Sequence, residues 1–254
     1  MDYSIQLYSV EDYVSETSLE EGIRAVAQMG YKYVEFCEYH GHTAEEIKGF
    51  MDKYGVKCSA AHLHEDVLLP DKFDETVAFH KILGCDTFII PCCDWSTPEK
   101  KKDLIAKFND IDKRLKAIGM HFAFHNHDGE FLKVDDGTTF AEDVLTKTEM
   151  ELEIDTFWLY NARIDTIEFL NKYKDRVRFL HLKDGIACKE KDFYFGNHRV
   201  GVEDRPVGYG ETDIKAIHDW AIKNDVMMVV ECENSGRVSL DYSKQSIEYL
   251  KTLD

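Results

Sequence analysis

The sequence predicts a single α/β domain over residues 1–254, folded as a (β/α)₈ TIM barrel. Eight short β-like segments recur at intervals of roughly 25–50 residues, and a helical pattern follows each one, as in a chain of βα units. The 254 residues, 44% of them hydrophobic, match the usual size of one such barrel. No low-complexity segment interrupts the alternation.

The eight strands are expected at residues 4–8, 33–37, 57–62, 87–91, 121–126, 151–155, 178–183 and 227–231. The alternative is an open doubly wound sheet, which would usually carry a glycine-rich fingerprint after its first strand. The residues there are Ser9-Val10-Glu11-Asp12, which do not match that fingerprint. The closed barrel is therefore favoured.

Helix signals fill the intervals between the strands. Ser18, Thr43 and Thr139 each precede a glutamate by three residues, the spacing of a capping box. Thr97-Pro98 places proline in a first turn, where its missing N–H costs nothing. The helix that follows carries one apolar stripe, which consists of Leu104, Phe108, Ile111, Leu115 and Ile118. Residues 185–212 form the one long irregular stretch, and loops of this length are usually functional.

Composition narrows the class of partner. The net charge of −18 disfavours nucleic acid and anionic membranes, because both would repel the protein. No secretory signal or apolar run of about 20 residues is visible. The seven cysteines follow no redox or zinc-binding spacing and are interpreted as reduced thiols. We therefore expect a cytoplasmic protein whose partner is a small molecule rather than nucleic acid or a membrane, and a homo-oligomer is left open.

Side chains alternate along each predicted strand, so every strand has two faces. One face is apolar and should meet the helices: Ile5, Leu7, Val34, Phe36, Phe122, Phe124, Leu152, Ile154, Leu180, Leu182, Val230 and Cys232. The opposite face ends in polar groups: Gln6, Tyr8, Glu35, His62, His125, Asp155, His181 and Glu231. In a barrel these ends converge on one pocket. Burying such groups unpaired would cost on the order of several kcal/mol each, so a shared divalent cation is expected.

At these strand ends the chain resembles the sugar phosphate isomerase/epimerase superfamily. That group includes xylose isomerase-like TIM barrels (AP endonuclease family 2), tagatose 3-epimerase, inosose dehydratase and endonuclease IV. The segments that carry the resemblance are 4–10, 124–131, 155–158, 181–184, 206–213 and 229–231, and they include Phe124-His125-Asn126-His127-Asp128 and His181-Leu182-Lys183-Asp184. The resemblance covers almost the whole chain.

The resemblance implies the metal ligands His125, Asp155, His181 and Glu231. His125 stands where many members have glutamate, so a symmetric epimerase with two glutamates does not follow directly. His127 and Glu233 are reserve ligands for the fifth and eighth strands. One divalent ion is expected, with Mn²⁺ as the first choice and Zn²⁺, Co²⁺ or Mg²⁺ as alternatives.

The leading functional hypothesis is a metal-dependent isomerase or epimerase of a keto-sugar or sugar-like polyol. It would remove a proton next to a carbonyl that the metal polarises. Glu231 is the expected base, with His125, Glu35 or His62 returning the proton. The alternative is a metal-dependent dehydratase or lyase acting on a 3-keto sugar or inosose, because a histidine acid opposite a glutamate base suits a leaving oxygen.

Two further classes are weighed against these. An endonuclease IV-like nuclease would need a basic surface, which this acidic chain does not suggest. A non-catalytic sugar-binding barrel would bind metal without exchanging any carbon-bound proton.

The expected substrate-binding residues are Gln6, Tyr8, His62, His127, Trp158 and Lys183. Trp158 is expected to stack under the sugar. Lys183 is expected either to bind a substrate oxygen or phosphate or to pair with a carboxylate. Arg237 is a weaker candidate for gripping an anionic substrate.

Overall fold

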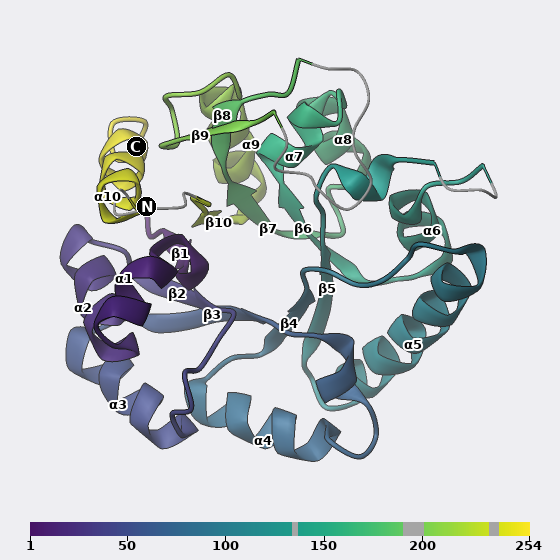
Figure 1. The fold of residues 1–254 in the computed structure, drawn as a ribbon, viewed down its shortest axis with the longest axis horizontal. Coiled ribbons are helices and arrows are strands. Elements are labelled where there is room, and N and C mark those ends of the chain that lie inside the picture. The colour runs from purple at the N-terminus through teal and green to yellow at the C-terminus, as the bar shows by residue number, and fades with distance from the viewer. Residues whose placement is uncertain (134–136, 190–200, 234–238) are drawn as a thin grey trace.

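A computed structural model describes residues 1–133, 137–189, 201–233 and 239–254. Eight parallel strands close a barrel in the order β1-β10-β7-β6-β5-β4-β3-β2, and Figure 1 shows the helices arranged outside them. Ser4 at the start of the chain pairs with Val229 near its end. This closure confirms the predicted barrel and removes the open-sheet alternative.

The barrel strands are β1 (Ser4–Gln6), β2 (Tyr33–Phe36), β3 (Lys57–His62), β4 (Thr87–Ile90), β5 (His121–His125), β6 (Glu151–Asp155), β7 (Val177–Leu182) and β10 (Met227–Val230). The helices are α1 (Glu11–Glu16), α2 (Leu19–Met29), α3 (Ala44–Tyr54), α4 (Phe73–Leu83), α5 (Pro98–Ala117), α6 (Phe140–Lys147), α7 (Thr156–Asn161), α8 (Thr166–Tyr173), α9 (Ile214–Asn224) and α10 (Ser239–Leu250). Short 3₁₀ turns are η1 (Leu7–Val10), η2 (Glu65–Leu68) and η3 (Gly129–Phe131).

The predicted helix starts are largely observed. The helices after Thr43 and Thr139 have complete capping boxes. Ser18 also caps its helix by accepting the Glu21 N–H, but the Glu21 carboxylate pairs with Arg24 rather than completing the box.

α5 follows its prediction except at its end. The Thr97 hydroxyl accepts the N–H of Lys100, and Pro98 occupies the first turn. Ile118 was expected on the apolar stripe, and this prediction is wrong: Ile118 is 42% exposed. It lies just past the last helical residue, where the backbone has left the helical path that would have carried it onto the core.

Two predicted segments differ in detail. The first strand stops at Gln6, and the chain turns into η1, where the Gln6 side chain accepts the N–H of Tyr8. Within the stretch expected to be irregular, β8 (Asp184–Ile186) pairs antiparallel with β9 (Glu203–Arg205). Figure 1 shows this hairpin at the same side of the barrel as α7 and α9.

Asp184 holds the turn that follows the hairpin. Its carboxylate accepts backbone N–H groups of Gly185, Gly208, Gly210 and Thr212 at 2.8–3.1 Å. A Cβ at Gly210 would lie 2.2 Å from the Asp184 carboxylate, so only glycine allows this approach. The turn at residues 206–210 is thus built around one buried carboxylate.

The two faces of the strands pack as predicted. The apolar face, exemplified by Val34, Phe122 and Leu180, lies in the large core shared with the helices. Inside the barrel a smaller apolar layer fills one level: Ala60, Ile89, Ala123, Phe179 and Val229. Polar side chains follow on the next residues of the same faces, for example His125 after Ala123 and His181 after Phe179. The apolar layer therefore fills the barrel interior beneath the polar groups.

In the part of the chain that the structure describes, none of the helices has both the length and the apolar character needed to cross a bilayer. Cys58, Cys85 and Cys232 are buried thiols, as expected.

Candidate active site

A cavity of about 440 Å³ lies over the polar ends of the strands. Its lining consists of Gln6, Tyr8, Glu11, Cys37, Glu38, His62, Leu63, His64, Pro91, Cys92, His125, His127, Glu231 and Glu233. Six predicted site residues are among them: Gln6, Tyr8, His62, His125, His127 and Glu231.

The other predicted site residues are fully buried and do not line this cavity: Glu35, Asp155, Trp158, His181 and Lys183. Asp155 and His181 nevertheless lie at the same end of the barrel, because they are register partners on β6 and β7. The predicted convergence of the strand ends is therefore observed, with part of the set behind the cavity wall.

Four side chains form a compact group that could hold a metal ion. His125, Asp155, His181 and Glu231 each offer one ligand atom, and these atoms lie within 4.8 Å of one another. Three buried atoms in the group have no hydrogen-bond partner among the described residues: Asp155 Oδ2, His181 Nδ1 and Glu231 Oε2. Leaving such atoms unsatisfied is costly, so the donor set fits a divalent cation.

Local structure fixes the Asp155 carboxylate. Its Oδ1 accepts the N–H of Trp158 at 2.8 Å as the N-cap of α7, which leaves Oδ2 for another partner. The Asn126 side chain bonds both the N–H and the carbonyl of Asp155. Burial raises the pKa of Asp155 to about 7, although the Lys183 ammonium opposes this. A nearby cation would restore the charged form.

Glu35 lies behind the histidine of β7. Its Oε1 accepts hydrogen bonds from Gln6 Nε2 at 2.7 Å and from His181 Nε2 at 2.8 Å, and His62 Nε2 is 3.0 Å away. Burial alone would raise the pKa of this carboxyl, but His62 and His181 outweigh that effect and hold it well below its usual range. Glu35 thus contacts other side chains rather than the cavity.

Glu153 occupies the matching place behind the histidine of β5. Its Oε2 lies 2.7 Å from His62 Nε2 and 3.1 Å from His125 Nδ1. Opposite Glu153 the partner strand β7 carries one extra residue, Arg178, and opposite Glu35 the partner strand β3 carries one, Ser59. Such an extra residue bends the strand that carries it and increases its local twist. Burial disfavours charge on His62, but the Glu35 and Glu153 carboxylates raise the pKa of His62 to about 9.

Lys183 pairs with carboxylates, as one of its two predicted roles required. Its Nζ lies 2.9 Å from Glu233 Oε1 and 3.8 Å from Glu231 Oε2. The same ammonium sits 5.0 Å from the Trp158 ring. Burial would raise the pKa of Glu231, but Lys183 and His181 hold it well below the usual range. Glu231 is therefore an ionised carboxylate at the cavity edge.

His127 lines the same cavity as Glu231, and the carboxylate of Glu130 lies beside it. Its backbone N–H donates to Glu130 Oε2 at 2.9 Å, and its Nδ1 lies 3.8 Å from Glu130 Oε1. Burial disfavours the charged ring, but Glu130 outweighs burial and raises the pKa of His127. A base and a potential proton donor thus share one cavity.

Sequence reasoning missed Glu153 and Glu130. A signal for Glu153 was present, since Glu151, Glu153 and Asp155 alternate on one face of a strand that ends at the site. Glu130 carried no such signal, because it lies in η3 rather than on a strand. Arg237 lies outside the described residues.

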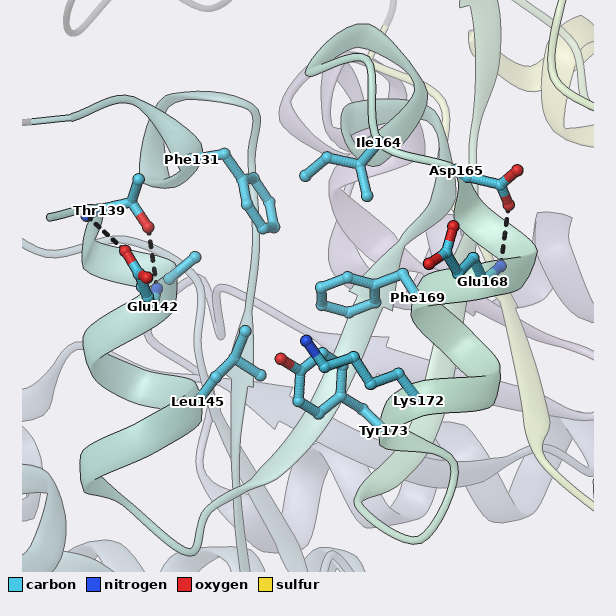
Figure 2. Close-up of a pocket in the computed structure, with 11 residues that line it drawn as sticks. Phe131, Thr139, Glu142, Leu145, Ile164, Asp165, Glu168, Phe169, Lys172 and Tyr173 are labelled. Atoms are coloured by element: carbon cyan, nitrogen blue, oxygen red, sulfur yellow. Dashed lines mark hydrogen bonds between the residues drawn. The ribbon is translucent and has the colours of Figure 1, made fainter.

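A different cavity, of about 330 Å³, lies on the outer wall between α6 and α8. Figure 2 shows Phe131, Leu145 and Phe169 facing it. Its lining is mainly apolar and contains none of the four grouped ligand residues. The chemistry-bearing groups therefore belong to the cavity at the barrel end.

The sequence is similar to those of several inosose dehydratases. An inosose dehydratase of Clostridium tetani is 26% identical over 165 residues, which cover 61% of this chain and 55% of that protein. The chain thus spans about half the length of this relative. An inosose dehydratase of Lacticaseibacillus casei is 22% identical over 271 residues, covering 92% of this chain and 89% of that protein.

Solved structures share the fold. A sugar phosphate isomerase/epimerase of Parabacteroides distasonis superposes with a TM-score of 0.77 at 22% identity, covering 98% of this chain and 96% of that one. A probable 3-DHS dehydratase of Bacillus anthracis gives 0.72 at 11% identity, covering 99% of both. The family model for xylose isomerase-like TIM barrels matches residues 23–253. With a closed parallel barrel and polar strand ends already in place, this match shows that the chain belongs to the xylose isomerase-like TIM barrel family.

Proposed function

We propose that this protein is a metal-dependent dehydratase of a keto-sugar or keto-polyol. The observation that carries the proposal is the group of His125, Asp155, His181 and Glu231, with three buried atoms that have no hydrogen-bond partner in the described part of the chain. These four residues would hold the ion, with Mn²⁺ as the first choice. When bound, the ion supplies Lewis acidity that polarises a substrate carbonyl and acidifies the adjacent C–H.

The protein's own groups account for the proton movements. Glu231 is ionised and lies at the cavity edge, so its carboxylate takes the proton from the substrate carbon. His127, backed by Glu130, donates a proton to the departing hydroxyl, which leaves as water. The electron pair of the broken C–H bond becomes the new C=C bond as the C–O bond breaks.

The general acid in this proposal is His127, in place of the His125 that the sequence suggested. His125 Nδ1 is already bonded to Glu153, and His125 belongs to the ligand group, so it is poorly placed to give up a proton. The placement of Glu35 behind His181 likewise favours a positioning role for Glu35 over direct contact with substrate.

An isomerase or epimerase, the leading hypothesis from the sequence, is the second candidate. It shares the first proton removal and the same grouped residues. The unlike pair of carboxylate and imidazole in the cavity favours elimination, because a leaving oxygen needs an acid. Similarity to inosose dehydratases supports the same choice.

The test is an assay of keto-sugars and inososes with Mn²⁺ in deuterated water, followed by NMR. We expect exchange of the hydrogen next to the carbonyl together with loss of water. Epimerised product without any loss of water would replace the dehydratase with the second candidate. The absence of exchange with every substrate tried would contradict both.

A further inference from the structure

We propose that Glu153 and Glu35 select the ring nitrogen that each histidine ligand offers, so that His125 binds metal through Nε2 and His181 through Nδ1. This inference rests on the proposed metal-dependent function. It assigns Glu153 and Glu35 as positioning residues, acting on the metal through the two rings rather than by contact with substrate.

The evidence for His125 is its bond to Glu153. Nδ1 of His125 lies 3.1 Å from Glu153 Oε2, and both residues are buried. An ionised carboxylate can only accept hydrogen bonds, so the hydrogen must be on Nδ1. The lone pair of a neutral ring then lies on Nε2, which becomes the atom available to a metal.

His181 has the opposite arrangement. Its Nε2 lies 2.8 Å from Glu35 Oε1 and 3.2 Å from Glu153 Oε1, so Nε2 carries the hydrogen. Its Nδ1 is 3.4 Å from Glu231 Oε2 and has no hydrogen-bond partner among the described residues. The two rings therefore present different nitrogens, each chosen by the carboxylate behind it.

A competing metal position uses the same rings in reverse. His62, His125, Glu153 and His181 also bring ligand atoms within 4.8 Å of one another. An ion there would take the nitrogens that now face the glutamates, His125 Nδ1 and His181 Nε2. Those nitrogens already have carboxylate hydrogen-bond partners, whereas the group of His125, Asp155, His181 and Glu231 contains three buried atoms with no hydrogen-bond partner among the described residues. The geometry thus favours an ion held by His125, Asp155, His181 and Glu231.

The two positions are distinguished by the metallated nitrogens. Protein labelled with ¹⁵N-histidine and loaded with ¹¹³Cd²⁺ would be examined by long-range ¹H–¹⁵N NMR for couplings to cadmium. We expect coupling at His125 Nε2 and His181 Nδ1. Coupling at the other nitrogen of either ring would overturn the inference while leaving a metal-dependent enzyme intact. Failure of the wild type to bind any divalent ion would overturn both this inference and the proposed function.

Variants test the positioning role directly. Glu153→Gln should weaken metal binding by about 10–100-fold, measured by competition titration, because a carboxylate behind a ligand histidine raises its basicity. The matched control is Glu151→Gln, on the same strand, where Oε1 also lies 3.1 Å from a histidine Nδ1, that of His121, outside the site. Equal metal affinity in the two variants would overturn the assignment. The wild-type NMR result stands even if Glu153→Gln fails to fold.

Discussion

His181 Nδ1 lies 3.4 Å from Glu231 Oε2, and both atoms are buried without a hydrogen-bond partner in the described parts of the chain. The two residues come from neighbouring strands, since β7 and β10 pair and the Glu231 N–H donates to Leu182 O just past His181. An imidazole and a carboxylate brought together in this way favour a cation between them. Glu231 also lines the cavity, so one residue would reach both the proposed ion and a substrate.

Asp155→Asn should lose the metal without losing the start of α7. Asparagine still caps a helix but lacks the negative charge that binds a divalent ion. The matched control is Asp165→Asn on α8, because Asp165 accepts the Glu168 N–H at 2.8 Å (Figure 2) just as Asp155 accepts the Trp158 N–H. Elemental analysis should find about one ion per chain in the wild type and the control. Equal metal in Asp155→Asn would remove Asp155 from the ligands.

Glu231→Gln should slow exchange of the substrate hydrogen by about 10²–10⁴-fold, the usual cost of removing a positioned base. Deuterium incorporation followed by NMR measures the effect. Because Glu231 is also a proposed ligand, the variant must be saturated with metal before the assay. Wild-type exchange rates in the metal-loaded variant would show that another group takes the proton.

His127→Gln separates proton removal from elimination. Its imidazole is the proposed acid, so deuterium exchange should continue while dehydration falls by about 10²–10⁴-fold. Both rates can be read from one NMR time course. If exchange and dehydration fall together, His127 acts in the first step or in binding. If neither changes, a different group protonates the leaving oxygen.

Stability should fall between about pH 6.5 and pH 4 because of His80 on α4. Burial lowers the pKa of His80 from 6.5 to about 4, and its Nδ1 bonds the Thr76 carbonyl. The folded state therefore binds fewer protons than the unfolded state in this pH window. The free energy of unfolding decreases as the pH falls through it. Once the pH is below the folded-state pKa, this pKa difference has lowered the free energy of unfolding by about 3 kcal/mol.

Urea unfolding of His80→Gln should show a shallower slope of stability against pH in this window. Tyr39→Phe is the control, because both variants lose the Tyr39–His80 hydrogen bond but only one loses the titrating ring. An unchanged slope in His80→Gln would mean that other groups dominate acid unfolding.

The sequence by itself determined the barrel and the location of its site. Strands that alternate apolar and polar residues have one face for the helices and one for the interior, whatever the details of packing. Parallel strands in one barrel also bring their carboxyl ends together. His125, Asp155, His181 and Glu231 could therefore be placed at one end of the barrel from their positions at strand ends, and the family resemblance singled them out as a ligand group.

Only the tertiary structure decided which of these groups contact each other. Glu153 and His62 are 91 residues apart, and His181 and Glu35 are 146 apart, so no local pattern contains their bonds. The pairing of β2 with β3 and of β6 with β7 shifts beside Glu35 and Glu153, where Ser59 and Arg178 are the extra residues. Periodicity gives the face on which a side chain lies, but contacts within that face depend on how strands are offset, and this offset comes from packing of the whole barrel.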